Sequence, residues 1–191
     1  MTGLEAFLAS TLTVTLAEMG DKTQLLAFAL SARFRRPWTV MLGIFIATVF
    51  NHLLAAAAGG WITQYIPPVV LAWGLGLSFI GFGVWTLIPD RYDENPELDK
   101  FGPLLTTIVL FFIAEIGDKT QLATVLLGAR YANVVVVVLG TTLGMLIADG
   151  LAVFLGSKLE RFVPLKFFHR MAAVLFVVLG VVTVSAFYVR L

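Results

Sequence analysis

The sequence contains no cysteine, which excludes a disulfide framework, a thiolate metal site and thiol redox chemistry. Charge is also scarce, because Asp, Glu, Lys and Arg make up 13% of the 191 residues where soluble domains carry about a quarter. The 13 basic and 12 acidic side chains nearly cancel, so the charge does not point to nucleic acid as a partner. The sequence shows no nucleophile with a base partner and no cofactor motif, so we expect neither an enzyme nor a bound cofactor.

Hydrophobic residues dominate the chain instead, at 59% of the total and with a mean hydropathy of +0.94. A bilayer core about 30 Å thick is crossed by roughly 20 apolar residues in a helix. The first apolar run has no basic segment before it, so we expect it to stay as a membrane helix and not to be cleaved as a signal peptide. The sequence predicts an all-α integral membrane protein with six transmembrane helices, near 4–32, 38–60, 68–89, 103–130, 133–156 and 167–189.

The two halves of the chain repeat each other. An offset of 97 residues places Glu18 on Glu115 and Gly43 on Gly140 without a gap. Three helices per repeat is an odd number, so the second repeat should enter the membrane from the opposite side and form an inverted repeat. The predicted organisation is a first three-helix repeat (1–89), an acidic cytoplasmic linker (90–102) and a second, inverted three-helix repeat (103–191).

The basic residues of the loops predict the orientation, because cytoplasmic loops are enriched in Lys and Arg. If the first loop is cytoplasmic, nine basic residues lie inside and only Arg130 and Arg190 lie outside. We therefore expect both termini on the non-cytoplasmic side. The acidic linker is then a solvated connection in the cytoplasm, and a metal-collecting loop is the alternative.

The charges inside the apolar runs belong to one motif that occurs twice, as EMGDKTQ at 18–24 and EIGDKTQ at 115–121. A charge at a helix centre costs about 2.5–3.5 kcal/mol, so these side chains should face protein or water and not lipid. In a continuous helix Glu18 shares a face with Asp21 and Lys22. The intervening Gly20 permits a local break, and transporters built from repeats place their ion sites at such breaks.

The charges of the two motifs do not balance. Four acids and two lysines leave two surplus negative charges, the charge of one divalent cation. If the cation leaves, crowded carboxylates should take up protons, so the motif predicts exchange of a divalent ion for protons. Oxygen ligands suit Mg²⁺, Ca²⁺ and Mn²⁺. The predicted metal ligands are Glu18, Asp21, Glu115 and Asp118, and the supporting ligands or charge partners are Lys22, Thr23, Gln24, Lys119, Thr120 and Gln121.

Small residues recur at every fourth position of the second and fifth runs, and such stripes predict close packing against the motif helices. They are Gly43, Ala47, Asn51, Ala55 and Gly59 in the first repeat, and Gly140, Gly144, Ala148, Ala152 and Gly156 in the second. His52 and Asp149 occupy equivalent positions beside these stripes. Each is a candidate proton relay or supporting ligand, or else a hydrogen-bonded packing residue.

The doubled Glu-x-Gly-Asp-Lys-Thr motif resembles that of uncharacterised protein family 16, the family of the yeast Golgi calcium/manganese transporter and of human transmembrane protein 165. The resemblance covers essentially the whole chain. It implies a secondary transporter of Mn²⁺ and Ca²⁺ that exchanges them for protons, with the acids of both motifs lining the cation path. It also implies, for bacterial members, manganese export.

The short N-terminal segment favours a multi-pass protein of a prokaryotic plasma (inner) membrane over an organelle protein. Two alternative functions stay open on the residues alone. One is an exporter of an amino acid or organic cation, in which the acids bind an ammonium group. The other is a non-transporting membrane scaffold, in which the charges form structural ion pairs. The sequence does not indicate an oligomeric state.

Overall fold

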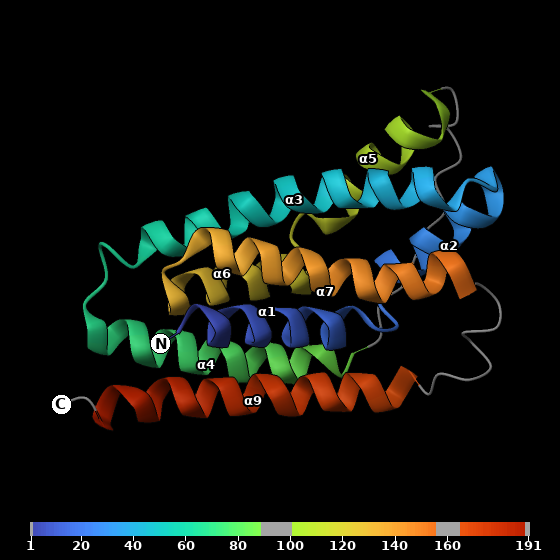
Figure 1. Cartoon of the computed structure of the whole chain (residues 1–191). Helices are drawn as coiled ribbons and strands as arrows, with labels where there is room; N and C mark the ends of the chain where they lie inside the picture. The colour runs from blue at the N-terminus through green and yellow to red at the C-terminus, as the bar shows by residue number, and fades with distance from the viewer. Residues whose placement is uncertain (1, 89–100, 156–164, 190–191) are drawn as a thin grey trace.

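The structure is a computed structural model that describes residues 2–88, 101–155 and 165–189 (Figure 1). These ranges contain eight helices and no strand, which confirms the all-α prediction. The helices are α1 (Gly3–Glu18), α2 (Lys22–Phe34), α3 (Pro37–Ile62), α4 (Pro68–Thr86), α5 (Gly102–Glu115), α6 (Lys119–Tyr131), α7 (Val134–Leu155) and α9 (Leu165–Val189).

Two of the six predicted runs are each divided into two helices at the charged motif. Gly20 and Gly117 lie at these breaks with φ of +84° and +75°, in the left-handed region that favours glycine. One expectation is therefore wrong: Glu18 does not share a helical face with Lys22, because Glu18 ends α1 and Lys22 begins α2. The left-handed glycine interrupts the helical periodicity on which that expectation depended.

Each break satisfies backbone groups that would otherwise be left without partners in an apolar environment. Gln24 Oε1 accepts a hydrogen bond from the Gly20 amide at 2.8 Å, and Gln121 Oε1 accepts one from the Gly117 amide at 2.7 Å. Asp21 is the N-cap of α2, and its Oδ1 accepts a hydrogen bond from the Lys22 amide at 3.0 Å. A membrane protein tolerates a broken helix where such partners are supplied.

Four helices are long and apolar enough to cross a membrane: α3, α4, α7 and the Arg170–Tyr188 part of α9. By contrast, α1, α2, α5 and α6 contain 16, 13, 14 and 13 residues, each short of the roughly 20 that a single crossing requires. The break thus turns each motif run into two short helices. The inverted repeat with six crossings remains a prediction.

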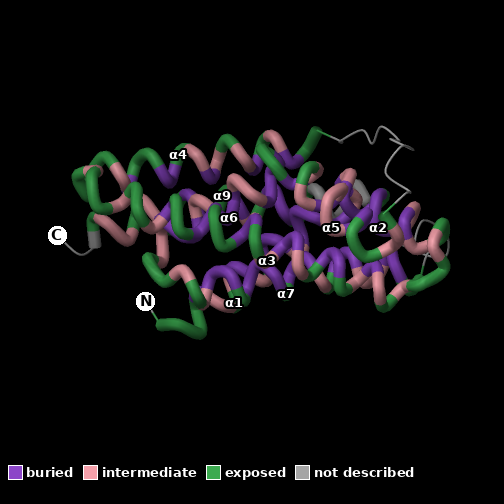
Figure 2. Tube along the Cα trace, turned by 90° about the horizontal axis from the view of Figure 1, so that it is seen from above, coloured by how far each residue is buried: buried purple, intermediate pink, exposed green. Residues whose placement is uncertain are grey.

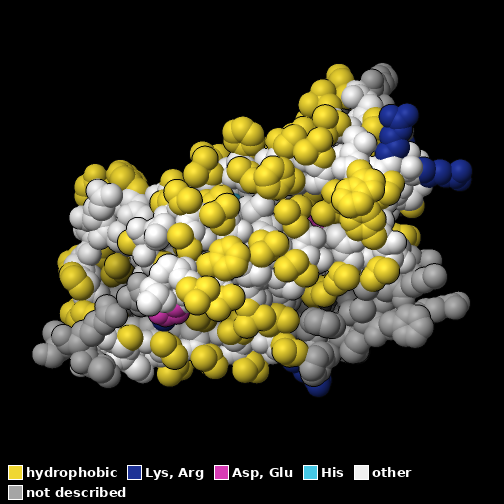
Figure 3. All heavy atoms as spheres, in the orientation of Figure 1, with side chains coloured by type: hydrophobic (Ala, Val, Ile, Leu, Met, Phe, Trp, Pro, Cys, Tyr) yellow, Lys and Arg dark blue, Asp and Glu magenta, His cyan; other side chains and the backbone are white. Residues whose placement is uncertain are grey.

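The outer surface is covered by apolar side chains, as Figure 3 shows for one face. Large aromatic residues are exposed near the ends of α3, with Trp38 at its start and Trp61 and Tyr65 at and after its end. Trp and Tyr concentrate at membrane interfaces, so these positions fit the two boundaries of a bilayer. The exposed arginines of the α2–α3 connection, Arg35 and Arg36, lie at one end of the molecule.

The helices of the two halves interleave. The closest neighbours of α1 and α4 are α7 and α9, while α3 packs against α5, α6 and α7. Figure 1 shows α4 and α9 side by side, and Figure 2 shows the buried residues along the helix faces that meet. The helix bounds also correspond under the offset of 97 residues, as with α2 (Lys22–Phe34) and α6 (Lys119–Tyr131).

The small-residue stripes lie in these contacts, as predicted. A β-carbon at Gly144 would lie 2.7 Å from the Thr11 carbonyl oxygen of α1, and one at Gly140 would lie 2.7 Å from that of Phe7. The same substitution at Gly43 would meet the Thr107 side chain of α5 at 2.6 Å. Absence of a side chain therefore sets how closely the long helices approach the motif helices.

Several sequence-based expectations fall outside the described residues. These are the acidic linker (90–102) apart from its last two residues, Gly156 of the second stripe, and Lys158 and Arg161 of the last loop.

Candidate cation site

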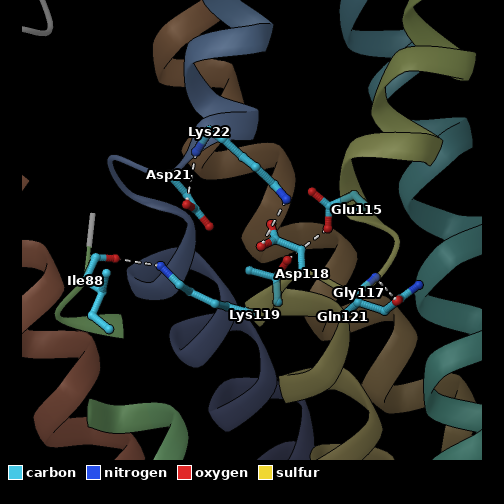
Figure 4. A network of polar contacts seen from close by, with 9 residues as sticks. Asp21, Lys22, Ile88, Glu115, Gly117, Asp118, Lys119 and Gln121 are labelled. Carbon is cyan, nitrogen blue, oxygen red and sulfur yellow. Dashed lines mark hydrogen bonds and ion pairs between the residues drawn. The ribbon is translucent and has the colours of Figure 1, made fainter. Parts of the chain in front are cut away.

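The structure brings the two motifs together at the centre of the molecule. Lys22 Nζ at the start of α2 lies 3.3 Å from Asp118 Oδ1 at the start of α6, so an ion pair joins the two breaks (Figure 4). The charges of Glu115, Asp21 and Asp118 all act on Glu18. Residues of both motifs thus contribute to one charged centre, and that this centre binds a cation stays a prediction.

The acids of this centre are removed from the surface. Glu18 and Glu115 are fully buried, and Asp21 and Asp118 are 2% and 3% exposed. Neither oxygen of Glu18 has a hydrogen-bond partner among the described residues, and the same holds for Glu115 Oε1. The other oxygen, Glu115 Oε2, accepts a hydrogen bond from Thr120 Oγ1 at 2.9 Å. Buried polar groups normally have partners, so these oxygens are available to a ligand.

The two lysines have different partners although they are equivalent in sequence. Lys22 is 27% exposed and pairs with Asp118. Lys119 is 3% exposed and donates a hydrogen bond from Nζ to the Ile88 carbonyl at 2.9 Å, with Nζ 5.8 Å from the centre of the Trp85 ring (Figure 4). The Ile88 carbonyl lies just beyond the C-terminal end of α4, where a positive charge is favourable. The structure thus gives Lys22 an acid as its charge partner, while Lys119 donates to a backbone carbonyl.

Each of the two glutamines links a break to the long helix of the other half through hydrogen bonds. While Oε1 holds the glycine amide, Gln24 Nε2 donates to the Ala148 carbonyl of α7 at 2.8 Å. Likewise Gln121 Nε2 donates to Asn51 Oδ1 of α3 at 3.2 Å. Both ends of each amide are engaged in hydrogen bonds that stabilise the breaks, and a role as supporting ligand stays a prediction. Thr23 lies beside Glu115, the glutamate of the other motif.

His52 and Asp149 are both fully buried, and none of their side-chain nitrogen or oxygen atoms has a hydrogen-bond partner among the described residues. The structure thus shows no hydrogen bond from a described residue to either side chain, and the roles predicted for both stay predictions. Asp149 interacts electrostatically with both motif glutamates: its charge acts on Glu18, and the charge of Glu115 acts on it. Asp149 thus belongs to the same electrostatic centre as the motif glutamates.

The sequence did not reveal every partner in this centre. The Ile88 and Ala148 carbonyls are backbone groups, which carry no sequence signal. Asn51 could have been found, because an amide in an apolar run on a packing stripe requires a partner. Among the described residues, no three carboxylate or imidazole side chains stand close enough together to hold a metal ion as they are. The acids are gathered but do not converge on one point.

These features define a helical membrane protein with two broken helices and a buried, acidic centre. Two segments of the chain, residues 6–94 and 103–189, match the model of the family described as "Divalent cation/proton antiporter GDT1". The chain belongs to this family, which is a family of transporters. The resemblance noted from the doubled motif is confirmed, and each repeat matches the family model separately.

Individual relatives agree with this assignment. A protein of Vibrio cholerae named "Putative manganese exporter" is 44% identical over 172 residues, which cover 90% of this chain and 86% of that protein. A GDT1-like protein of Synechocystis is 28% identical over 94% of this chain and 97% of its own length. The chloroplastic protein PAM71 of Arabidopsis thaliana is 29% identical over 94% of this chain and 56% of its own length. No solved structure matches the chain.

Proposed function

We propose that this protein exports Mn²⁺ across the plasma membrane in exchange for protons, and that Ca²⁺ is a weaker substrate. The observation that carries the proposal is the buried acidic centre formed by both broken helices of a chain in the divalent cation/proton antiporter family. The Vibrio cholerae relative, by its name, supports manganese as the cation and export as the direction.

The proposed cation path is lined by Glu18, Asp21, Glu115 and Asp118. Ionised carboxylates gathered in a buried site are costly unless a cation or protons neutralise them. Their oxygens are hard ligands, which suit Mn²⁺ and Ca²⁺. A compact site between two helix breaks favours the smaller of these two ions. The cation is cargo here, and the same side chains must release it on the other side of the membrane.

Proton exchange follows from competition for the same oxygens. Metal binding requires deprotonated carboxylates, so binding a cation releases protons and binding protons releases the cation. Because either form neutralises the buried acids, the loaded and the protonated centre can each be exposed to both sides. The empty, fully ionised centre is disfavoured, and this disfavoured state couples the two fluxes. His52 remains a candidate relay on the proton path.

For the whole chain we propose six crossings arranged as two inverted three-helix repeats, in which each broken pair, α1 with α2 and α5 with α6, crosses as one unit. The matching helix bounds of the two halves and the equivalent glycine breaks support this arrangement. In transporters of this design, one repeat moves against the other around a central site.

The test is transport by the purified protein in liposomes whose interior is more acidic than the bath. We expect Mn²⁺ to accumulate inside, the interior to become more alkaline as it does, and a protonophore to abolish the accumulation. Ca²⁺ should compete only at higher concentration than Mn²⁺. Glu18→Gln and Glu115→Gln should each remove the flux, while Glu5→Gln at the exposed start of α1 should leave it unchanged.

Three outcomes would contradict the proposal. Mn²⁺ entry that ignores the pH difference would indicate a uniporter or channel. Normal flux in either glutamine variant would show that the acidic centre is not the cation path. Uptake of labelled lysine or an organic amine in place of Mn²⁺ would support the alternative exporter class.

A further inference from the structure

The acids of the centre fall into two groups by what their oxygens already contact. Asp21 caps α2 through the Lys22 amide, and Asp118 forms the ion pair with Lys22. By contrast, Glu18 and Asp149 are fully buried with both oxygens lacking a hydrogen-bond partner among the described residues. Glu115 is intermediate, because Thr120 donates to one of its oxygens and the other has no such partner. A buried carboxylate without a partner is costly, so its retention calls for a ligand.

The packing of α7 places Asp149 beside the end of α1. The two helices run side by side, with Gly140 against Phe7 and Gly144 against Thr11. Thr15 Oγ1 of α1 also donates to the Gly144 carbonyl, at 3.3 Å. Continuing this register by about one further turn brings Asp149 to the level where α1 ends.

A hydrogen bond holds α7 at that level. The Ala148 carbonyl, next to Asp149 in sequence, accepts the Gln24 hydrogen bond from the first break. Asp149 is therefore next to a residue that is hydrogen-bonded to the break that carries Glu18, and the charge of Asp149 acts on Glu18.

The first half of the chain offers no equivalent acid. The position that corresponds to Asp149 is His52 in α3. The position that corresponds to Ala148 is Asn51, whose Oδ1 accepts a hydrogen bond from Gln121 Nε2. The two halves share the glycine breaks and the glutamine hydrogen bonds to the glycine amides, but they differ at this buried position. Among the described residues of the two long helices, α7 thus brings a carboxylate to this position and α3 does not.

We infer that Asp149 is a direct cation ligand, so that Glu18, Glu115 and Asp149, from α1, α5 and α7, hold the ion together. Asp21 and Asp118 are then positioning residues that fix the two breaks. The inference rests on the proposed function and reassigns roles within its site. Because no such trio is close enough to bind an ion in the conformation described, loading draws the long helix α7 toward the ends of the two short helices.

The experiment measures Mn²⁺ binding to the purified full-length protein in detergent, by electron paramagnetic resonance of free Mn²⁺, and its thermal midpoint with and without Mn²⁺. Asp149→Asn should weaken Mn²⁺ affinity by about 100-fold or more, since changes even to groups behind the ligands cost about 10–100-fold. It should also abolish the rise in midpoint that Mn²⁺ produces in the parent protein. The metal-free midpoint should not fall, because the variant removes a costly buried acid. The control Glu5→Gln should match the parent in every measurement.

Affinity within about threefold of the parent in Asp149→Asn would overturn the inference and leave the proposed function standing. A parent protein that binds no Mn²⁺ would overturn both. If Asp149→Asn does not fold, the same two measurements on Asp149→Glu distinguish a ligand role from a packing role. A ligand role predicts a shift of about tenfold or more in Mn²⁺ affinity with the metal-free midpoint kept, whereas a packing role predicts a lower midpoint and unchanged affinity.

Discussion

Gln24 and Gln121 are equivalent residues, and each links a glycine break to a long helix through hydrogen bonds, but their surroundings differ. Gln24 is 4% exposed and reaches a buried stretch of α7, whereas Gln121 is only partly buried and the Gly117 amide that it holds is exposed. A hydrogen-bonding group that loses its partner costs about 1–3 kcal/mol when buried, and much less when water can replace the partner. We therefore expect Gln24→Leu to lower the thermal midpoint clearly more than Gln121→Leu. Equal losses measured by differential scanning fluorimetry would contradict this difference in environment.

At the same scale, the sequence predicted residue types better than residue roles. Charge cost and the doubled motif identified Glu18, Glu115 and their neighbours as facing protein, and the structure buries them. The glutamines were predicted as ligands or charge partners, but both ends of their amides are already bonded. That assignment depends on tertiary partners such as the Ala148 carbonyl, and one backbone carbonyl is identical to any other in the sequence.

Among the elements, the break in each motif run is the feature that sets the site apart from an ordinary membrane helix. The sequence indicated it through an apolar run longer than one crossing and a glycine between the acids. The periodicity argument that placed Glu18 and Lys22 on one face failed, because helix periodicity holds only within a continuous helix. The positive φ of Gly20 and Gly117 is a backbone property that becomes visible only when the chain is folded.

Gly117→Ala tests the break directly. The residue has φ of +75°, and a β-carbon there would meet nothing within 4 Å, so the substitution adds only backbone strain of about 1–2 kcal/mol. Gly102 at the start of α5 has the same φ and equally open surroundings. We expect Gly102→Ala and Gly117→Ala to lower the thermal midpoint alike, but only Gly117→Ala to slow Mn²⁺ transport in liposomes. Equal transport in both variants would show that transport does not depend on a glycine at the break.

The long helices should be sensitive to added volume only where they cross the other half. At Gly59 a β-carbon would overlap the Val125 carbonyl of α6, while at Gly81 in α4 it would meet nothing within 4 Å. Overpacking costs about 1–3 kcal/mol, and alanine favours a helix over glycine by about 1 kcal/mol. Gly59→Ala should therefore lower the thermal midpoint and Gly81→Ala should hold or raise it. A midpoint unchanged in Gly59→Ala would contradict the close α3–α6 contact.

For the whole molecule, the interleaving of helices means that the two repeats are not separate domains. The first broken helix packs on α7 and the second on α3, so each half completes the other. If one repeat moves against the other, as the proposed function requires, the contacts that change are those along the small-residue stripes. Because the helices of the two repeats interleave, the orientation of one repeat in the membrane is coupled to the orientation of the other.

The inverted repeat predicts on which side of the membrane each connection lies. The chain has no cysteine, so single cysteines can be introduced without a background. Arg36, Gln64 and Asn133 are exposed and lie in or beside the α2–α3, α3–α4 and α6–α7 connections. Because α3 separates the first two, Arg36→Cys and Gln64→Cys should react with a membrane-impermeant maleimide from opposite sides. If the second repeat is inverted, as we propose, Asn133→Cys should react from the same side as Gln64→Cys, although it occupies the position equivalent to Arg36. Intact cells should label the Gln64 and Asn133 variants, and inside-out vesicles the Arg36 variant. Labelling of Asn133→Cys together with Arg36→Cys would mean that the two repeats run in parallel, and the six-crossing arrangement would have to be abandoned.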